Sequence, residues 1–309
     1  MGSAKLARGP APTSRPALAT RSPRIGLALG SGGARGLAHI GVIEVLEEHG
    51  VSIDFVAGTS IGALVGGLYA SGATSEDLRR IASGATLRKI INLFDPSLRQ
   101  GFIRGTRLER SIEDQVGGLR VEGCRIPLAI IATDLRSGET VVFQEGDLAS
   151  AVRASVSVPW VFRPVQLEGR LLADGGLSMP VPAEQVRSMG AEVVVAVDLD
   201  WERPVNDPSK EDEPGLWQIA NDSLALLRRH LAAQDARYAD VVVRPAFGRE
   251  VRWDGFLDPD ELIECGRVAM RSQMGALEAA TATRSSELGA TAGSLGSPDD
   301  PGHENPRVD

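Results

Sequence analysis

One serine in the sequence has the surroundings that nucleophilic catalysis requires. Ser60 is the central residue of Gly58-Thr59-Ser60-Ile61-Gly62, a G-x-S-x-G pattern between a predicted strand and a predicted helix. A tight turn there lifts the hydroxyl clear of the sheet, and Gly58 and Gly62 let the strand and the helix approach closely. The helix directs its N-terminal amides at the serine, where negative charge would develop. A serine that merely caps the helix is the alternative, but the buried strand and the small-residue helix favour a nucleophile.

A second glycine-rich turn precedes this serine by one strand–helix unit. Residues 30–36 are Gly-Ser-Gly-Gly-Ala-Arg-Gly, and such a run exposes several main-chain N–H groups to an anion or an oxyanion. A dinucleotide site would need glycine in place of Arg35 and an acid at the end of the next strand, whereas Asp54 begins that strand. Neighbouring loops of an α/β sheet meet at one edge, so we expect an oxyanion hole for Ser60. A purely structural turn is the alternative.

Histidine is the usual base for such a serine, and the chain has four. They are His39, His49, His230 and His303. The first three fall in predicted helices, where a surface or packing role is expected, and the fourth lies near the C-terminus. His230 could complete a triad with Ser60 and Asp174, but a triad histidine normally comes from a loop, and His230 lies in the middle of a helix.

Asp174 is the better base. It ends the apolar run Leu171–Ala173 and is followed by Gly175 and Gly176, so its carboxylate is held in place with open space above it. Burial in such a pocket raises the pKa of a carboxyl group toward useful basicity. An ordinary Asp-Gly turn is the alternative and, for this motif taken alone, the commoner one.

The elements that would hold these residues alternate between strands and helices. The expected strands cover residues 24–29, 53–57, 128–133, 140–143, 192–197 and 240–244, with a hairpin over 165–173. The expected helices cover about 37–46, 61–71, 107–116, 147–154, 180–189, 216–236 and 258–282, and a polar linker covers 202–214. This order predicts one α/β domain over residues 24–283, a mostly parallel central sheet covered by helices on both faces. A disordered basic tail (1–23) and a disordered polar tail (284–309) would flank it.

Three motifs in a fixed order resemble a known family. SGGARG (31–36), GTSIG (58–62) and DGG (174–176) are similar to the glycine-rich loop, the serine elbow and the D-G-[GA] motif of the patatin-like phospholipases. The similarity covers about residues 25–200, and the bacterial single-domain members and the catalytic domain of neuropathy target esterase look nearest. Each motif alone is unspecific, whereas the three in order are specific. The resemblance implies a patatin-like three-layer α/β/α fold.

The family uses a Ser–Asp dyad without histidine, so the resemblance implies that Ser60 is the nucleophile and Asp174 the general base. It also implies an oxyanion hole made by the amides of Gly32, Gly33 and Ala34, with Arg35 at the family's basic position and supporting roles for Gly58, Gly62, Gly175 and Gly176. The chain departs from the family's G-G-G-x-[KR]-G at its first glycine, which is Ser31 here. A serine disfavours positive φ, so we expect a slightly reshaped loop and a neutral or mildly activating effect of Ser31→Gly.

The resemblance further implies an acyl hydrolase of ester-linked lipids, such as lysophospholipids, that needs no metal and no organic cofactor. Two alternatives stay open. One is a regulatory or adaptor protein on the same scaffold, against which the intact Ser60 and Asp174 count. The other is an acyltransferase, which would pass the acyl group to an acceptor other than water.

Composition narrows the partners. A net charge of −8 argues against general affinity for nucleic acid. Cys124 and Cys265 offer neither a disulfide framework nor metal-ligand spacing. No segment has the length of a transmembrane helix and no secretory signal is visible, so a cytoplasmic location is expected. The basic residues before Glu44 leave a transient contact with an anionic membrane surface open, beside a simply solvated tail. The oligomeric state stays undetermined.

Overall fold

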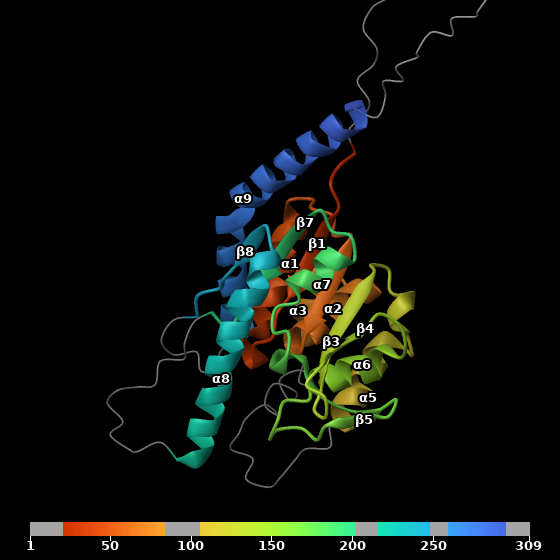
Figure 1. Ribbon diagram of the computed structural model, residues 1–309, viewed down its shortest axis with the longest axis vertical. Coiled ribbons are helices and arrows are strands. Elements are labelled where there is room, and N and C mark those ends of the chain that lie inside the picture. The colour runs from red at the N-terminus through yellow and green to blue at the C-terminus, as the bar shows by residue number, and fades with distance from the viewer. Residues whose placement is uncertain (1–20, 84–105, 202–214, 248–258, 295–309) are drawn as a thin grey trace, which may run out of the picture.

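A computed structural model describes residues 21–83, 106–201, 215–247 and 259–294 (Figure 1). The expected linker over 202–214 lies outside the described residues, as do residues 1–20 of the expected basic tail and residues 295–309 of the expected polar tail. The strands are β1 (Ile25–Leu29), β2 (Phe55–Thr59), β3 (Leu128–Asp134), β4 (Thr140–Phe143), β5 (Val165–Leu167), β6 (Arg170–Asp174), β7 (Val193–Val197) and β8 (Val241–Val243). The helices are α1 (Ala38–Glu48), α2 (Ile61–Ser71), α3 (Ser75–Ser83), α5 (Thr106–Val116), α6 (Leu148–Ser155), α7 (Ala183–Ser188), α8 (Leu216–Asp235) and α9 (Pro259–Ser294).

These strands form one mixed sheet with a parallel centre, as the alternating pattern predicts. The order β3-β2-β1-β7-β8 has parallel neighbours throughout. β4 and β6 both pair with β3 in the antiparallel sense, and β5 completes a hairpin with β6. Because the central strands are parallel, the loops after β1 and β2 and the turn after β7 lie at the same edge of the sheet.

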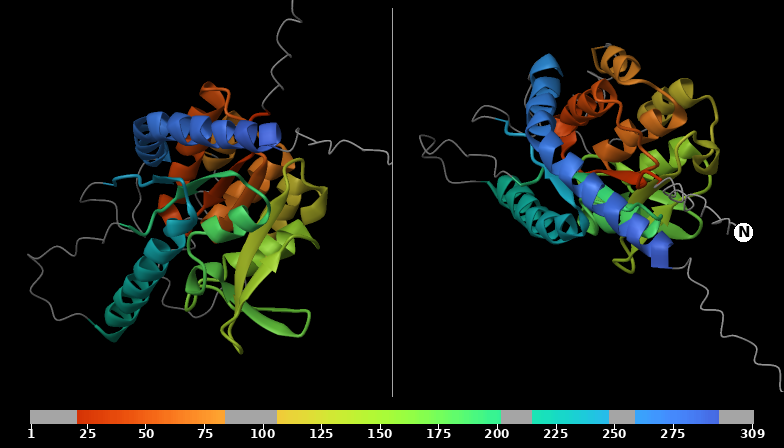
Figure 2. Two further views of the ribbon diagram at one scale, coloured as in Figure 1. Left: turned by 45° about the horizontal axis from the view of Figure 1, so that its top comes forward. Right: turned by 90° about the horizontal axis from the view of Figure 1, so that it is seen from above.

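The two faces of the sheet are buried by different helices, because side chains alternate along each strand. One face of β1 and β7 presents large residues, among them Leu27, Leu29 and Val195, to a core completed by α1, α2, α6 and α9. The other face presents small residues such as Ala28 and Ala196 to α7 and the C-terminal part of α8. Figure 2 shows the sheet between these two helical layers. The fold is therefore the predicted three-layer α/β/α arrangement.

Two helices differ from the sequence expectation. α3 is absent from the predicted elements although Thr74 and Asp77 form a reciprocal cap at its start: Asp77 N–H donates to Thr74 Oγ1 at 3.2 Å and Thr74 N–H to Asp77 Oδ2 at 3.0 Å. α9 continues past the predicted end near residue 282, so the expected start of the polar tail at 284 falls within a helix. Four of its hydroxyls, those of Thr281, Thr283, Ser285 and Ser286, donate to main-chain carbonyls four residues earlier. Residues 284–294 are therefore helical and not part of the expected tail.

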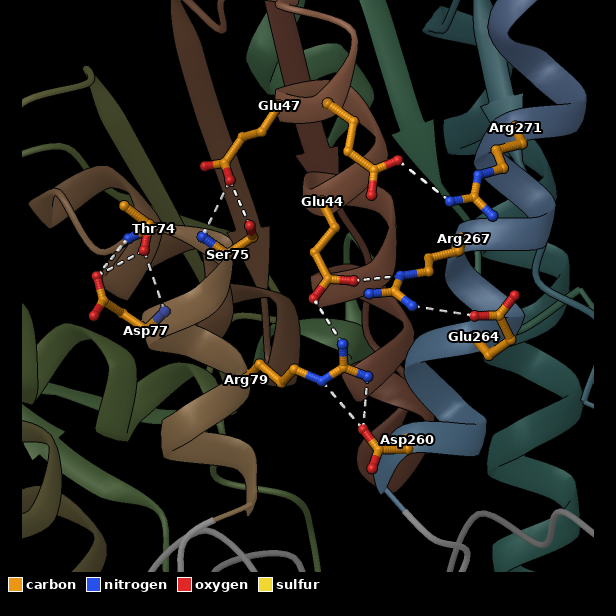
Figure 3. A network of polar contacts seen from close by, with 11 residues as sticks. Glu44, Glu47, Thr74, Ser75, Asp77, Arg79, Asp260, Glu264, Arg267 and Arg271 are labelled. Atoms are coloured by element: carbon orange, nitrogen blue, oxygen red, sulfur yellow. Dashed lines mark hydrogen bonds and ion pairs between the residues drawn. The ribbon is translucent and has the colours of Figure 1, made fainter.

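A network of ion pairs joins α1 to α3 and α9 (Figure 3). Its centre is the buried Glu44 of α1, which accepts from Arg267 Nε of α9 at 2.5 Å and lies 3.6 Å from Arg79 Nη1 of α3. Arg79 in turn donates to Asp260 Oδ1, in the first turn of α9, at 2.6 Å. Because α1 follows the glycine loop, these contacts hold the helical layer behind that loop.

None of the described helices combines the length and the apolar character needed to cross a bilayer. The N-terminal part of α8 extends away from the sheet (Figures 1 and 2) and exposes Leu216 to 85%.

Candidate active site

Ser60 lies at the carboxyl end of β2, on the turn into α2. Its backbone has φ 56° and ψ −121°, a conformation that residues other than glycine rarely adopt and that tends to occur at functional sites. The residue is 3% exposed. Its Oγ donates to Asp174 Oδ2 at 2.5 Å, while the N–H groups of Ala63 and Leu64 bond to its main-chain oxygen. The side chain is therefore not a helix cap, and it is free to contact a carboxylate.

The strained turn is held by a side chain that sequence reasoning did not single out. Ser60 N–H donates to Ser155 Oγ at 2.8 Å, and Ser155 Oγ donates to Ile131 O at 2.5 Å. Ser155 is fully buried at the end of α6. Its hydroxyl therefore links the elbow to β3 by satisfying a donor on one side and an acceptor on the other. The sequence carries no local sign of this contact, because 95 residues separate the two serines.

Asp174 meets Ser60 because β3 extends beyond the end of β2. The last β2 residue, Thr59, pairs with Ile131, and the next residue of β3, Ala132, pairs with Asp174 of β6. β4 pairs with β3 along residues 130–133, so β2 and β6 share the other edge. This register places the residue after β2 beside the residue that ends β6, although 114 positions separate them in the sequence.

The surroundings of Asp174 tune its carboxyl group. Oδ2 accepts from Ser60 Oγ and Oδ1 accepts from Gly176 N–H at 2.7 Å, while the side chain is almost fully buried. Burial raises the pKa of Asp174 to about 6, against the opposing effects of these hydrogen bonds and of the Arg228 charge. At neutral pH the group is mostly ionised, yet it is more basic than an ordinary aspartate. Such a group suits proton transfer from a hydroxyl.

The glycine loop enters the 3₁₀ turn η1 (Gly33–Leu37), which runs into α1. Gly33 has φ 59°, which a β-branched residue would strain to adopt. Among the described hydrogen bonds outside regular helices and strands, none has the N–H of Gly32, Gly33 or Ala34 as donor. The first N–H groups of a helix have no acceptor within it, so these three amides suit an anion.

This loop lies against both the elbow and the turn after Asp174. Gly62 of α2 is so close to β1 that an added Cβ would lie 2.7 Å from Gly30 O. At Gly176 an added Cβ would lie 3.2 Å from Ser31 Oγ. Gly36, Gly58 and Gly175 are likewise in close contact, with Ile61, Ala63 and Ile131 respectively. The structure therefore places the glycine loop beside the serine elbow and beside the turn after Asp174.

The expectation of a loop reshaped by Ser31 rests on the strain that positive φ would cause at this residue, and the structure shows no such strain. Among the described residues other than glycine, positive φ occurs at Ser60, Trp160 and Glu168, so Ser31 is not strained. Its hydroxyl donates to Asp200 Oδ2 at 2.8 Å, and Arg35 Nη2 donates to Asp200 Oδ1 at 2.9 Å. Sequence reasoning missed Asp200, although it follows the apolar strand β7 as Asp174 ends β6.

None of the described histidines forms a hydrogen bond with Ser60 or Asp174. His39 is fully buried with Nε2 2.8 Å from Gly30 O, and burial lowers its pKa to about 4 despite that hydrogen bond. It is therefore neutral and donates to the carbonyl. His49 contacts Val45 O through Nδ1, and His230 is exposed on α8. His303 lies outside the described residues. Within the described ranges, no group of three or more His, Cys, Asp or Glu side chains is arranged to hold a metal ion.

If the glycine loop bound a dinucleotide, Asp54 could not serve as the acid that binds the ribose. Its Oδ2 accepts from Ile25 N–H at 2.7 Å, at the amino end of β1. The glycine loop follows the other end of the same strand. A ribose-binding acid would have to lie beside the loop.

Comparisons with known proteins cover the part of the chain that contains these residues. The family model described as patatin-like phospholipase matches residues 27–187, which include the loop, the elbow and Asp174. An uncharacterized NTE family protein of Mycobacterium tuberculosis (strain ATCC 25618 / H37Rv) is 42% identical over 208 residues, 67% of this chain and 57% of that protein. Lysophospholipase NTE1 of Scheffersomyces stipitis is 31% identical over 208 residues, 64% of this chain and 13% of that protein.

The chain thus spans little more than half of the first of these relatives and a small part of the second. Among solved structures, VipD from Legionella pneumophila is similar in fold, with a TM-score of 0.53 and 13% identity over 84% of this chain and 67% of that one. Since the family model matches more than half of the 309 residues, this chain belongs to the patatin-like phospholipase family.

Proposed function

We propose that this protein is a serine acyl hydrolase of ester-linked lipids, with Ser60 as nucleophile and Asp174 as general base. The observation that carries the proposal is the 2.5 Å hydrogen bond from Ser60 Oγ to Asp174 Oδ2, a carboxylate whose burial raises its pKa to about 6. A strained elbow and a nearby set of main-chain donors support the same chemistry.

In the first half of the reaction Ser60 Oγ attacks the ester carbonyl carbon, and its proton passes to Asp174 Oδ2. The carbonyl oxygen becomes an oxyanion, which the N–H groups of Gly32, Gly33 and Ala34 stabilise. When the tetrahedral intermediate collapses, the bond to the alcohol breaks. The alcohol oxygen takes the proton back from Asp174 and leaves, and Ser60 keeps the acyl group as an ester.

Water completes the cycle. Asp174 accepts a proton from a water molecule as its oxygen attacks the acyl carbon, and the same three amides hold the second oxyanion. Collapse releases the fatty acid, and Ser60 Oγ recovers its proton from Asp174. One carboxylate therefore acts as base and then as acid in each half, which a pKa near the working pH favours.

A lipid substrate, including a lysophospholipid, is supported by the family and by the name of the yeast relative, a lysophospholipase. The test is turnover of lysophosphatidylcholine, diacyl phosphatidylcholine and a soluble p-nitrophenyl ester. Ser60→Ala and Asp174→Asn should each lower kcat by orders of magnitude, whereas His230→Ala should leave it near the wild-type value. A loss of activity in a folded His230→Ala variant would instead favour the triad.

A fluorophosphonate probe gives an independent readout, because it reacts with an activated serine. Labelling should map to Ser60, and a label on another serine would refute the assignment. The adaptor alternative predicts neither labelling nor ester turnover in the wild-type protein. Product analysis separates hydrolysis from transfer, since transfer to a second lysophospholipid gives a diacyl product and no free fatty acid.

A further inference from the structure

The turn after β7 carries a buried carboxylate that the proposed mechanism does not use. Asp200 is 5% exposed, and its N–H donates to Asp198 Oδ1 at 3.1 Å. Leu199 lies directly against the glycine loop, since a Cβ added to Gly32 would lie 2.7 Å from Leu199 Cδ1. The turn and the loop are therefore packed as one unit at the edge of the sheet where Ser60 lies.

The two oxygens of Asp200 hold the two ends of the proposed oxyanion loop. Oδ2 accepts from Ser31 Oγ at 2.8 Å, and Oδ1 accepts from Arg35 Nη2 at 2.9 Å. The residues that supply the proposed oxyanion donors, 32–34, are the ones between these two contacts. Arg35 Nε also lies 3.4 Å from Gly32 O, so the arginine binds back onto the start of the same segment.

The charges in this cluster are balanced by arginines from two elements. Arg35 has a 5% exposed side chain, and Arg228 of α8 lies 3.3 Å from Asp200 Oδ1. Burial alone would raise the pKa of Asp200, but the charges of Arg228 and Arg35, with the hydrogen bonds from Ser31 and Arg35, hold it below its ordinary value. Asp200 is therefore ionised and can only accept hydrogen bonds, which fixes the Ser31 hydroxyl as a donor toward it.

We propose that Asp200 is a positioning residue for the oxyanion loop: by binding Ser31 with one oxygen and Arg35 with the other, it fixes the three amides between them. The inference rests on the proposed function, because those amides matter only if an oxyanion forms. Net stability does not explain the cluster, since a buried ion pair often contributes no more than apolar residues of the same volume. Hydrogen bonds at both ends of a short loop do restrict where its amides can lie.

The hydrogen bond to Asp200 assigns a role to the hydroxyl of Ser31. A glycine at this position, as in the family pattern, would leave Asp200 Oδ2 without its hydroxyl donor. Ser31→Gly is therefore expected to lower activity, which reverses the expectation drawn from the sequence. Displacement of catalytic groups by about 1 Å can lower a rate by about 10²-fold.

The test uses Ser31→Ala, which removes only a hydroxyl, and Asp200→Asn, which removes the charge. Each should lower kcat by about 10- to 100-fold with KM unchanged, because the loop acts on charge present in the transition state. Their combined effect should be smaller than the product of the single effects, since both act on one contact. Ser75→Ala is the matched control: Ser75 Oγ also donates to a carboxylate, Glu47, but in the network of Figure 3. It should leave kcat unchanged.

Thermal unfolding shows whether each variant is folded. If Asp200→Asn does not fold, the kcat of Ser31→Ala alone tests the positioning role. Wild-type kcat in folded Ser31→Ala would overturn the positioning role while leaving the proposed hydrolase intact. A higher KM at unchanged kcat would also overturn it, because it would mean a role in substrate binding. A wild-type protein with neither ester turnover nor labelling at Ser60 would refute the proposed function, and the positioning role with it.

Discussion

Replacing Asp174 by asparagine is expected to abolish ester turnover and, at neutral pH, to stabilise the protein. Asparagine has nearly the same shape, and its oxygen can still accept from Gly176 N–H while its amide group donates to Ser60 Oγ. The substitution therefore removes mainly the buried charge. Proton transfer from Ser60 is lost with it, because an amide is not a base.

The gain in stability follows from the raised pKa. A group whose pKa is higher in the folded than in the unfolded chain favours folding while it is protonated and disfavours it once ionised. The pKa of Asp174 rises from 3.8 to about 6, mainly through burial. This difference corresponds to about 3 kcal/mol. The wild-type protein should therefore lose about 3 kcal/mol between about pH 4 and about pH 6 through this group alone.

Urea denaturation of both proteins at pH 7 and near pH 4 measures this. Asp174→Asn should be more stable at pH 7, by up to about 3 kcal/mol, and close to wild type near pH 4. Asp200 gives a control of opposite sign, since its pKa is lowered and its Asn variant should be less stable at pH 7. An Asp174→Asn variant that is less stable at pH 7, or differs from wild type equally at both pH values, would refute the reasoning.

Three further outcomes are expected. Ser155→Ala leaves Ser60 N–H and Ile131 O without their hydroxyl partner, so the free energy of unfolding should fall by about 1–3 kcal/mol for each group. The control is Ser223→Ala, which removes an exposed hydroxyl bond to a carbonyl on α8. It should change the free energy of unfolding by less than about 0.5 kcal/mol. Ser60→Gly should be more stable than Ser60→Ala by about 1 kcal/mol in urea denaturation, because glycine adopts φ 56° without strain. Equal stabilities of the two variants would mean that the backbone of the elbow is not strained. Gly33→Val should lower kcat by about 10²–10³-fold with little change in KM, and an unaltered kcat would exclude this loop as the oxyanion hole.

Much of the fold could be predicted because its signals are local. β7 and the first five residues of β3 are continuous apolar runs, which a sheet covered on both faces requires. The end of α9 could not be predicted, since its Gly, Ser and Thr residues are weak helix formers and have the composition expected of a tail. The start of α3 could have been predicted, because the spacing of Thr74 and Asp77 in the sequence is that of a helix cap.

The residues of the candidate site also differ in whether a local sequence signal reveals them. Ser60, Asp174 and the glycine loop each belong to a motif, so each could be named from neighbouring residues. Ser155 and Asp200 act across long stretches of chain, and no spacing in the sequence joins them to the residues that they hold. Such partners become visible only when the sheet edge is assembled.

The meeting of Ser60 and Asp174 depends on register, which the motifs do not encode. Glu168 and Gly169 both have positive φ and form the two-residue turn that joins β5 to β6, which sets the pairing within that hairpin. The pairing of β6 with β3 then decides where Asp174 lies, and a slip of one residue would turn its side chain to the other face of the sheet. Asp174 O accepts from Thr133 Oγ1 at 3.0 Å and Asp174 N–H donates to Ser157 O at 3.0 Å, so β6 is held in register by contacts on either side of the base. These contacts, and not the D-G-G motif itself, put the carboxylate within hydrogen-bonding distance of the serine.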